Sequence, residues 1–336
     1  MRLTINGVQF EILGDPHMGR PFRNGVPLHR LGDRERMQRT ALQLSLDNAR
    51  SAAVAAHICM GDLFDKPKVD NRVVAQVADD YQMAARTNYC PFFILTGNHD
   101  EMRDADFVSS FHLFTRIVDD HVHVIRNEPR RRVFEDPENQ SVAQVVFIPW
   151  HPLKTALEMV DEHAELIRGA DAVFGHWDVD RRLEGTDNYI PAERLVELGV
   201  KQAITGHDHV RRQMTVAGLP VQVTGSMQPY SHSEDPERKM YATCPADDVR
   251  RMVGMQPDYF KDTCLRVVGD WDDPVPNCLQ FKVVPEEMAE AEEALAQVQV
   301  ADFSMKELWA QAFEGIDPEI NQTLAGKFAE LGGEED

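Results

Sequence analysis

The amino-acid sequence predicts an α/β protein in which a layered sheet is covered by helices on both faces. Short apolar runs typical of buried strands alternate along the chain with segments whose apolar residues recur at helical spacing. Such alternation is typical of layered α/β folds. The expected strands span residues 8–15, 55–62, 91–100, 143–151, 171–176 and 202–207, and the expected helices span 33–54, 71–87, 152–168 and 191–198.

A polar residue closes every one of these apolar runs. In chain order the closing residues are Asp15, Asp62, Asp100, His151, His176 and His207. Ligand sites of open α/β sheets lie at the carboxyl ends of the strands. We therefore expect the chemistry of this protein along one edge of the sheet.

The composition is that of a globular protein with an acidic C-terminal segment. The 336 residues are 43% hydrophobic and 27% charged, and the net charge is −21. Residues 285–336 hold 14 acidic residues and two lysines, so much of the negative charge lies there. Five cysteines without a CxxC pair argue against a disulfide framework or a thiolate zinc site. No apolar block is long enough for a signal peptide or a membrane span, so we expect a cytoplasmic protein without a membrane partner.

The pattern changes after residue 235. Residues 236–285 are expected to form a small accessory region, with strands at "KMYATC" and "NCLQFKVV" and a short helix near 246–254. Residues 286–336 are expected to form an acidic connector and two helices. The apolar stripe of the first helix contains Met305, Leu308, Trp309, Ala312 and Phe313, and that of the second contains Ile320, Leu324, Phe328 and Leu331. For the first of these two helices, binding to a partner is slightly favoured over packing on the core.

The groups near the strand ends form a set that suits divalent metal ions. They are Asp15 and His17 in "GDPH", Asp62 in "GDLFD", Asn98 and His99 in "GNHD", His176 in "GHWD", and His207 and His209 in "GHDH". Carboxylate, amide oxygen and neutral imidazole suit manganese, iron or zinc. Eight groups are too many for one ion. Two ions about 3.5–4 Å apart could share a carboxylate and clamp both oxygens of a phosphoryl displacement, which is a hydrolytic arrangement.

The two histidines of "GHDH" are expected to act as a divided ligand pair. Residues two apart on an extended strand point to the same side, so His207 and His209 can face the site together. Asp208 then points away and is interpreted as a supporting or turn residue.

The five motifs, in this order, resemble those of the calcineurin-like metallophosphoesterases and span residues 14–209. This resemblance implies a four-layer αββα sandwich over residues 1–235, followed by the small accessory or capping region over 236–285 and the connector and partner-binding helices over 286–336. It also implies two divalent ions, most plausibly Mn²⁺, with Mg²⁺, Fe²⁺ or Zn²⁺ as alternatives.

The resemblance also implies a role for each residue of the site. Asp15, His17 and His209 would hold one metal ion, Asn98, His176 and His207 would hold the other, and Asp62 would bridge them. His99 matches the family's catalytic histidine, which contacts the phosphate and protonates the leaving oxygen. Asp100 would be the carboxylate that orients His99.

Within this superfamily, "MGDLFDKP", "LTGNHDE" and "VTGSMQPYSHSED" resemble the SbcD-type DNA nuclease subunits and their phage recombination-nuclease relatives. That resemblance implies a DNA exonuclease or endonuclease acting in DNA repair, recombination or degradation. Its C-terminal helices would dock on the coiled coil of an SMC-like ATPase of the SbcC or Rad type. Cellular members often carry a histidine at the position of Asp65. The oligomeric state stays open, with a homodimer among the alternatives.

Two other functions stay open at this point. One is a phosphoesterase acting on a small molecule, a nucleotide or a phosphoprotein, which the net charge of −21 favours. The other is an acidic scaffold or regulator with a vestigial metal site. The remaining histidines are interpreted as structural or surface residues, except that His151 and His232 are kept as candidate substrate contacts. Arg211 and Arg212 follow the last motif closely enough to meet a phosphodiester backbone.

Overall fold

The computed structural model describes most of the chain up to residue 286. The described residues are 1–50, 54–87, 90–102, 107–136, 139–180, 185–235, 237 and 240–286. The chain divides into two compact units, Met1–Val284 and Pro285–Asp336. The helices predicted beyond residue 286 lie outside the described residues. No helix of the described part is long and apolar enough to cross a membrane.

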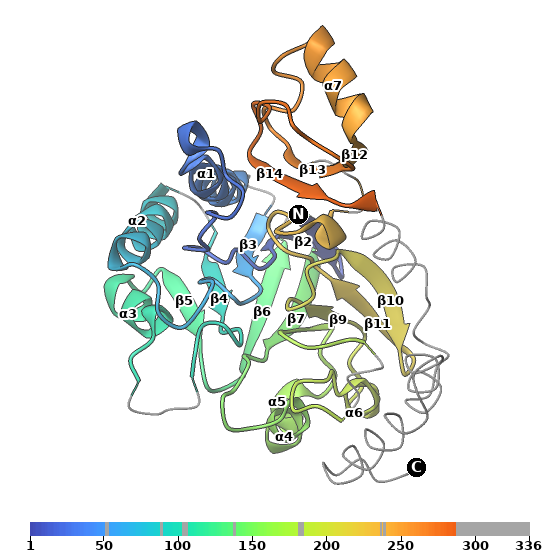
Figure 1. Ribbon diagram of the computed structural model, residues 1–336. Helices are drawn as coiled ribbons and strands as arrows, with labels where there is room; N and C mark the ends of the chain where they lie inside the picture. The colour runs from blue at the N-terminus through green and yellow to red at the C-terminus, as the bar shows by residue number, and fades with distance from the viewer. Residues whose placement is uncertain are drawn as a thin grey trace, which may run out of the picture. The chain divides into compact units, whose positions relative to one another are not determined.

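Two sheets of mainly parallel strands form the centre of the first unit (Figure 1). The first sheet has the order β1-β2-β3-β4-β5, in which only β1 runs antiparallel to its neighbour. Its strands are β1 (Arg2–Ile5), β2 (Val8–Leu13), β3 (Val54–Cys59), β4 (Phe92–Leu95) and β5 (Val122–Ile125).

The second sheet has six strands in the order β10-β11-β9-β8-β7-β6. Both of its edge strands are antiparallel to their neighbours, whereas the inner strands are parallel. The strands are β6 (Arg130–Asp136), β7 (Ser141–Phe147), β8 (Ala172–Gly175), β9 (Ala203–Thr205), β10 (Arg212–Val216) and β11 (Leu219–Val223).

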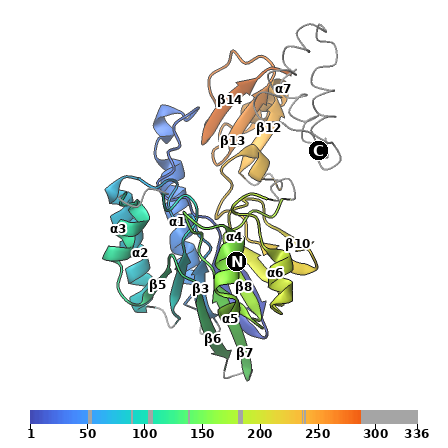
Figure 2. The same cartoon turned by 90° about the horizontal axis from the view of Figure 1, so that it is seen from below.

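The two sheets pack face to face and helices cover their outer faces, so the predicted four-layer αββα sandwich is confirmed (Figure 2). Between the sheets, the Phe93 ring from β4 stacks on the Phe147 ring from β7 with their centroids 4.9 Å apart. The first sheet is covered by α1 (Asp33–Asn48), α2 (Asn71–Thr87) and α3 (Ser110–Ile117). The second is covered by α4 (Ala156–Glu162), α5 (Ala164–Ile167) and α6 (Ala192–Glu197).

The accessory region is a three-stranded parallel sheet with one helix. The strands are β12 (Tyr241–Pro245), β13 (Cys264–Val268) and β14 (Gln280–Val284), and the helix is α7 (Ala246–Met255). Val249 of α7 is fully buried against this sheet. A short 3-10 helix at His232–Glu234 precedes this region, and another at Leu28–Arg30 precedes α1.

Two of the predicted helices differ from the observed ones. The helix expected over 33–54 ends at Asn48, and Val54 already begins β3. The helix expected over 152–168 begins only at Ala156, because Thr155 and Glu158 form a capping box there. It is also divided into two helices at His163, whose φ of −114° is not helical. Elements with weak apolar periodicity were missed altogether, namely β1, β5, β6, β10, β11, β13 and α3.

His57 of β3 is a fully buried core histidine, as expected for a histidine outside the motifs. Its Nε2 lies 3.1 Å from the Ser45 hydroxyl of α1, and its ring lies against Phe92. Burial lowers the pKa of His57 from 6.5 to about 3. The folded protein therefore holds this imidazole neutral at pH values where the unfolded chain would protonate it.

This burial predicts a pH dependence of stability. Between pH 6.5 and about 3 the unfolded chain binds the His57 proton and the folded chain does not, so the free energy of unfolding should fall as pH falls through this range. The His57→Gln variant keeps a polar partner for Ser45 but does not titrate. Urea denaturation of the metal-free proteins at several pH values should show a shallower decline for the variant, and parallel curves would contradict the assignment.

Candidate metal centre

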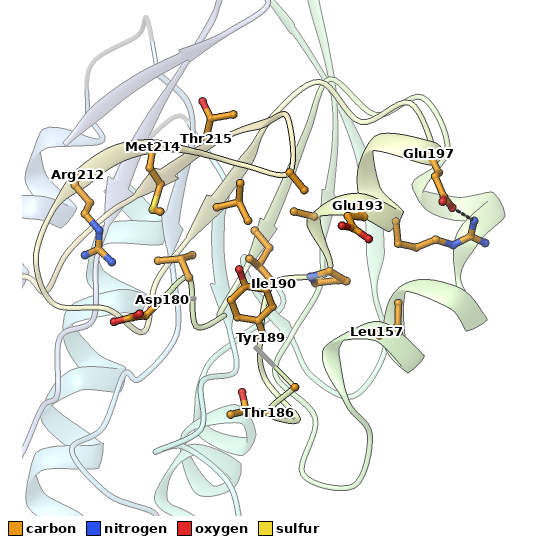
Figure 3. A pocket seen from close by; sticks show the side chains of 17 residues that line it. Leu157, Asp180, Thr186, Tyr189, Ile190, Glu193, Glu197, Arg212, Met214 and Thr215 are labelled. Carbon is orange, nitrogen blue, oxygen red and sulfur yellow. Dashed lines mark hydrogen bonds and ion pairs between the residues drawn. The ribbon is translucent and has the colours of Figure 1, made fainter. Parts of the chain in front are cut away.

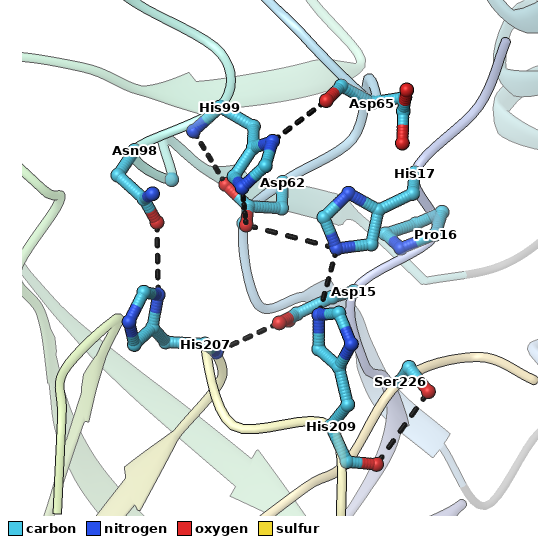
Figure 4. A network of polar contacts seen from close by, with 12 residues as sticks. Asp15, Pro16, His17, Asp62, Asp65, Asn98, His99, His207, His209 and Ser226 are labelled. Carbon is cyan, nitrogen blue, oxygen red and sulfur yellow. Dashed lines mark hydrogen bonds and ion pairs between the residues drawn. The ribbon is translucent and has the colours of Figure 1, made fainter. Parts of the chain in front are cut away.

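The motif residues come together on the loops that follow five strands (Figure 4). Three of these strands belong to the first sheet and two to the second. The predicted alignment of these residues along one edge is therefore observed, and the edge is shared by both sheets. β2 leads to Asp15 and His17, β3 to Asp62, β4 to Asn98, His99 and Asp100, β8 to His176, and β9 to His207 and His209.

Three of these residues adopt left-handed backbone conformations that side chains other than glycine rarely take. The φ angles are 45° at His17, 48° at Asp62 and 75° at His207. Hydrogen bonds hold these turns: the His17 N–H donates to the Asp62 carbonyl at 2.9 Å, and the His207 N–H donates to Asp15 Oδ2 at 2.7 Å. Left-handed residues concentrated at one site indicate backbone strain that the surrounding fold maintains, which is common at functional sites.

Glycines next to these turns allow the loops to approach one another. A Cβ at Gly97 would lie 2.2 Å from Asp62 Oδ1, and a Cβ at Gly206 would lie 2.5 Å from Asp15 Oδ1. A side chain at either position would therefore displace a carboxylate of the site.

Asp15, His17 and His209 form the first group of ligands. Their potential ligand atoms all lie within 4.8 Å of one another. Nε2 of His17 faces Nε2 of His209 at 2.9 Å. Burial raises the pKa of Asp15 to about 6 despite the nearby imidazoles, and it lowers the pKa of His17 to about 3 despite Asp62.

Asp62, His176 and His207 form the second group, within the same 4.8 Å limit, and Asn98 completes it. The Asn98 carboxamide oxygen lies 3.0 Å from His176 Nε2 and 2.9 Å from His207 Nδ1. The outer nitrogen of His176 is fixed, because its Nδ1 lies 2.9 Å from the Met60 carbonyl. Burial alone would lower the pKa of His176, but the Asp62 carboxylate outweighs it and raises the pKa to about 10.

Asp62 lies between the two groups. Its Oδ2 is 3.8 Å from His17 Nε2 and 3.4 Å from His176 Nε2, so one carboxylate oxygen reaches both. Burial would raise the pKa of this carboxylate, but His176 and His17 hold it well below its usual range. Asp62 is therefore ionised at neutral pH, as a shared metal ligand must be.

His99 stands at the open side of this arrangement. Its side chain is 42% exposed, and its Nε2 lies 4.0 Å from Asp62 Oδ2. Its backbone N–H donates to Asp62 Oδ1 at 2.9 Å, which fixes the residue against the buried carboxylate.

The sequence-based expectation that Asp100 orients the His99 ring is not what the geometry shows. The His99 Nδ1 lies 2.6 Å from the backbone carbonyl of Asp65. The buried Asp100 carboxylate instead accepts from the backbone N–H groups of Gly97, Leu63 and Phe64 at 2.9 to 3.3 Å. Asp100 thus joins the loops after β3 and β4. Burial and the neighbouring Asp62 raise its pKa well above the usual range, against the effect of those N–H groups.

The argument that His207 and His209 share one side of a strand is wrong. β9 ends at Thr205, and the left-handed turn at His207 redirects the chain. The turn points the two imidazoles to different groups of ligands. Asp208 is a turn residue as interpreted, since its carboxylate accepts from the Val210 N–H at 3.1 Å and pairs with Arg212 at 2.5 Å.

Two carboxylates at the site were missed in the sequence. Asp178 lies 2.7 Å from His207 Nε2, and Glu234 lies 3.3 Å from His209 Nδ1. Asp178 follows His176 by two residues and belongs to "GHWD", which was the available signal. Glu234 follows His209 by 25 residues, so only the fold brings it to the site.

Two histidines kept as candidate substrate contacts have local partners in the structure. Nδ1 of His151 accepts from the Leu153 N–H at 3.1 Å, and the His232 ring lies 4.9 Å from the Tyr241 ring of the accessory sheet. Neither belongs to the groups of ligands described above.

The chemistry of the site fits divalent cations. Asp15 Oδ1 is a buried polar atom without a hydrogen-bond partner in the described part of the chain. Two imidazole nitrogens facing each other at 2.9 Å also leave at least one lone pair directed into the centre. Carboxylate and imidazole ligands converging in this way can hold borderline divalent ions.

Two hollows on the second sheet share part of their lining. The smaller, about 260 Å³, is lined by Asp178, Val179, Asp180, His207, Asp208 and His209. The larger, about 1020 Å³, shares Val179 and Asp180 with it but contains none of the predicted ligands (Figure 3). Tyr189, Ile190 and Met214 line the larger one.

Comparison with known protein families gives one match for this chain. Residues 10–211 match the family described as calcineurin-like phosphoesterase. Similar solved structures include a putative 5'-nucleotidase from Staphylococcus aureus, with 14% identity over 64% of this chain and 48% of that one and a TM-score of 0.41. Another is the phosphopantetheinyl hydrolase of Mycobacterium tuberculosis, with 11% identity over 68% and 91% of the two chains and a TM-score of 0.40. A dimetal phosphatase from Danio rerio shows 13% identity over 65% and 87%, with a TM-score of 0.39.

No curated protein is significantly similar to the chain in sequence. The family match, however, covers more than half of the chain and includes every strand end that supplies a ligand group. The chain therefore belongs to the calcineurin-like phosphoesterases, a family of hydrolases that act on phosphoester bonds.

Proposed function

We propose that this protein is a two-metal phosphodiesterase whose substrate is DNA. The observation that carries the two-metal part is the position of Asp62, whose Oδ2 lies within 4 Å of imidazoles in both groups of ligands. Asp15, His17 and His209 would hold one ion, Asn98, His176 and His207 the other, and Asp62 both. The mixed oxygen and nitrogen ligands favour Mn²⁺. When bound, such ions supply Lewis-acid activation of water and of the phosphoryl oxygens.

The chain's own residues supply the proton chemistry. The Asp65 carbonyl accepts the Nδ1 proton of His99, so the second proton of the imidazolium lies on Nε2, on the open side of the site. From there it can pass to the departing sugar oxygen, because the side chain is 42% exposed and accessible to a substrate. The buried Asp62 carboxylate lies 4.0 Å from Nε2, so the proton donor stands directly beside the proposed shared ligand.

Unpaired basic residues beside the site support an extended anionic substrate. Lys66 and Lys68, on the loop after Asp62, and Arg211, after His209, are exposed and have no ion pair in the described part of the chain. Arg212, by contrast, is paired with Asp208. Residues 285–336 carry much of the net charge, so the negative total does not argue against DNA at the centre. The SbcD-like motifs around Asp62 and Asn98 also favour a nuclease.

The proposed partner is an SMC-like ATPase of the SbcC or Rad type, bound through the predicted C-terminal helices. These helices lie outside the described residues. The proposal therefore rests on the apolar stripe from Met305 to Phe313 and on the nuclease resemblance.

A small-molecule phosphoesterase is the second candidate. The hollow beside His207 and His209 is lined by Asp178, Asp180 and Asp208. Such an acidic wall would repel a long phosphate backbone on that side and suits a compact substrate with few phosphates.

Replacing the shared carboxylate should remove metal binding and catalysis together. Asp62→Ala deletes the ligand common to both ions, so Mn²⁺ stoichiometry should fall below two and hydrolysis of bis-p-nitrophenyl phosphate should fall by about 10³-fold or more. Calorimetric titration and a chromogenic assay measure the two effects. Asp70→Ala removes an exposed carboxylate paired only with Arg72 and should leave both unchanged.

Replacing His99 should separate proton transfer from metal binding. His99→Asn should slow cleavage of DNA by about 10²–10⁴-fold, because the alkoxide leaving group needs a proton. Hydrolysis of bis-p-nitrophenyl phosphate should fall much less, since p-nitrophenolate leaves without protonation, and two Mn²⁺ ions should still bind. An equal loss on both substrates would contradict the role of His99 as a general acid.

Charge reversal beside the site tests the substrate class. With Mn²⁺, the protein should cleave end-labelled linear duplex or single-stranded DNA as well as bis-p-nitrophenyl phosphate. Lys66→Glu should raise the KM for DNA and reduce the salt dependence of binding by about one phosphate contact, without changing hydrolysis of the small ester.

Arg50→Glu is the matched control, since Arg50 lies beyond the end of α1, before β3 begins and away from the strand ends of the site. Cleavage of the small ester or of a nucleotide without cleavage of any DNA would decide for the second candidate.

A further inference from the structure

The two missed carboxylates contact one imidazole from each group of ligands, in each case on the ring nitrogen that faces away from the centre. His207 directs Nδ1 at the Asn98 oxygen, 2.9 Å away, while its Nε2 lies 2.7 Å from Asp178 Oδ1. His209 directs Nε2 at His17, 2.9 Å away, while its Nδ1 lies 3.3 Å from Glu234 Oε1. The nitrogen that faces the centre is Nδ1 in His207 and Nε2 in His209. The two carboxylates therefore make the same kind of contact with opposite ring nitrogens.

The Asp178 backbone and the Glu234 carboxylate are each held in place independently of the imidazole. The Asp178 backbone is fixed on both sides, since its N–H donates to the Asn188 carbonyl and its carbonyl accepts from Ile190, both at 3.0 Å. The Glu234 carboxylate accepts from the Tyr230 N–H at 2.8 Å and from the Ser231 hydroxyl at 3.0 Å. Both side chains are more than four-fifths buried. The Glu234 carboxylate is therefore preorganised by its own hydrogen bonds, and Asp178 by its fixed backbone and its burial.

A carboxylate on the outer nitrogen has two consequences for the inner one. It holds the proton on the outer nitrogen, which leaves the inner lone pair free for a metal ion. Its negative charge also makes the imidazole a stronger donor, and removal of such partners typically weakens metal affinity about 10–100-fold. His176, whose Nδ1 faces only the neutral Met60 carbonyl, lacks this charge effect.

We propose that Asp178 and Glu234 are positioning residues that set the affinities of the two metal sites separately, Asp178 through His207 and Glu234 through His209. This inference rests on the proposed two-metal function and adds a division of labour to it. The two ions share Asp62 but have different charged partners behind them, so the protein can hold one ion more tightly than the other.

The test is a Mn²⁺ titration of metal-free protein, followed by anomalous diffraction of Mn²⁺-soaked crystals to locate each ion. Asp178→Asn and Glu234→Gln keep an oxygen that can accept the ring proton but remove the charge. Asp178→Asn should weaken binding about 10–100-fold at the ion beside His207 only, and Glu234→Gln should do the same at the ion beside His209 only.

Asp80→Asn is the matched control. Its carboxylate on α2 is also largely buried but pairs with Arg39 of α1 at 2.9 Å, so both affinities should match those of the wild type. Thermal unfolding of the metal-free variants separates a ligand effect from a loss of structure.

The possible outcomes test this inference separately from the proposed two-metal function. In one outcome the wild-type protein binds two ions and hydrolyses the ester, while the variants keep both affinities within about twofold or lose both ions equally. That outcome would overturn only the separate roles of Asp178 and Glu234. Wild-type protein that binds no Mn²⁺ would overturn the proposed function as well.

Discussion

The buried carboxylate of Asp62 is the constraint on which the rest of the site depends. An ionised carboxylate removed from water costs several kcal/mol unless charged partners and hydrogen bonds replace its hydration. Here the partners come from separate parts of the fold. The His99 N–H follows β4, and His17 follows β2 in the same sheet, whereas His176 follows β8 in the opposite sheet. The charge can therefore be satisfied only when the carboxyl ends of both sheets meet, so the architecture of the sandwich and the state of the site are coupled.

The turns that deliver these partners are supported from outside the site. The Gln38 amide of α1 donates to the carbonyls of Pro16 and His17 at 2.9 and 2.7 Å, and the Tyr230 hydroxyl donates to the Pro16 carbonyl. Both side chains thus hold the left-handed turn at His17. Arg34, one helical turn before Gln38, is buried and donates to the Pro229 carbonyl and to the Cys264 sulfur of β13. A single face of α1 therefore connects the accessory sheet to the loop that carries two of the ligands.

The parts of this site that the sequence predicts are those governed by strand ends. A buried apolar run followed by Asp or His fixes where the side chain emerges, and for Asp62, His176 and His207 this was enough to place the residue at the common edge. The sequence could not predict the partners behind the imidazoles. Glu234 reaches His209 through a loop, and the Asp65 carbonyl that holds His99 is a backbone group whose direction depends on the left-handed turn at Asp62. The spacing argument for His207 and His209 failed for a related reason. It assumed that the strand continues through both histidines, whereas β9 ends at Thr205.

The charges around the centre are arranged asymmetrically, and this bears on how a substrate can approach. Exposed Lys66 and Lys68 lie on the loop that also carries the Asp65 carbonyl and therefore on the side of His99. Asp178, Asp180 and Asp208 surround His207 on the other side. The first side attracts an anionic substrate more than the second does, although Arg212 offsets the charge of Asp208, so a phosphate is expected to approach beside the exposed imidazole. The acidic residues on that side include Asp178, which contacts Nε2 of His207 at 2.7 Å. If His207 binds a metal ion as proposed, the acidic side follows from the contact that would support this ligand, and the proposed proton donor His99 lies on the opposite side.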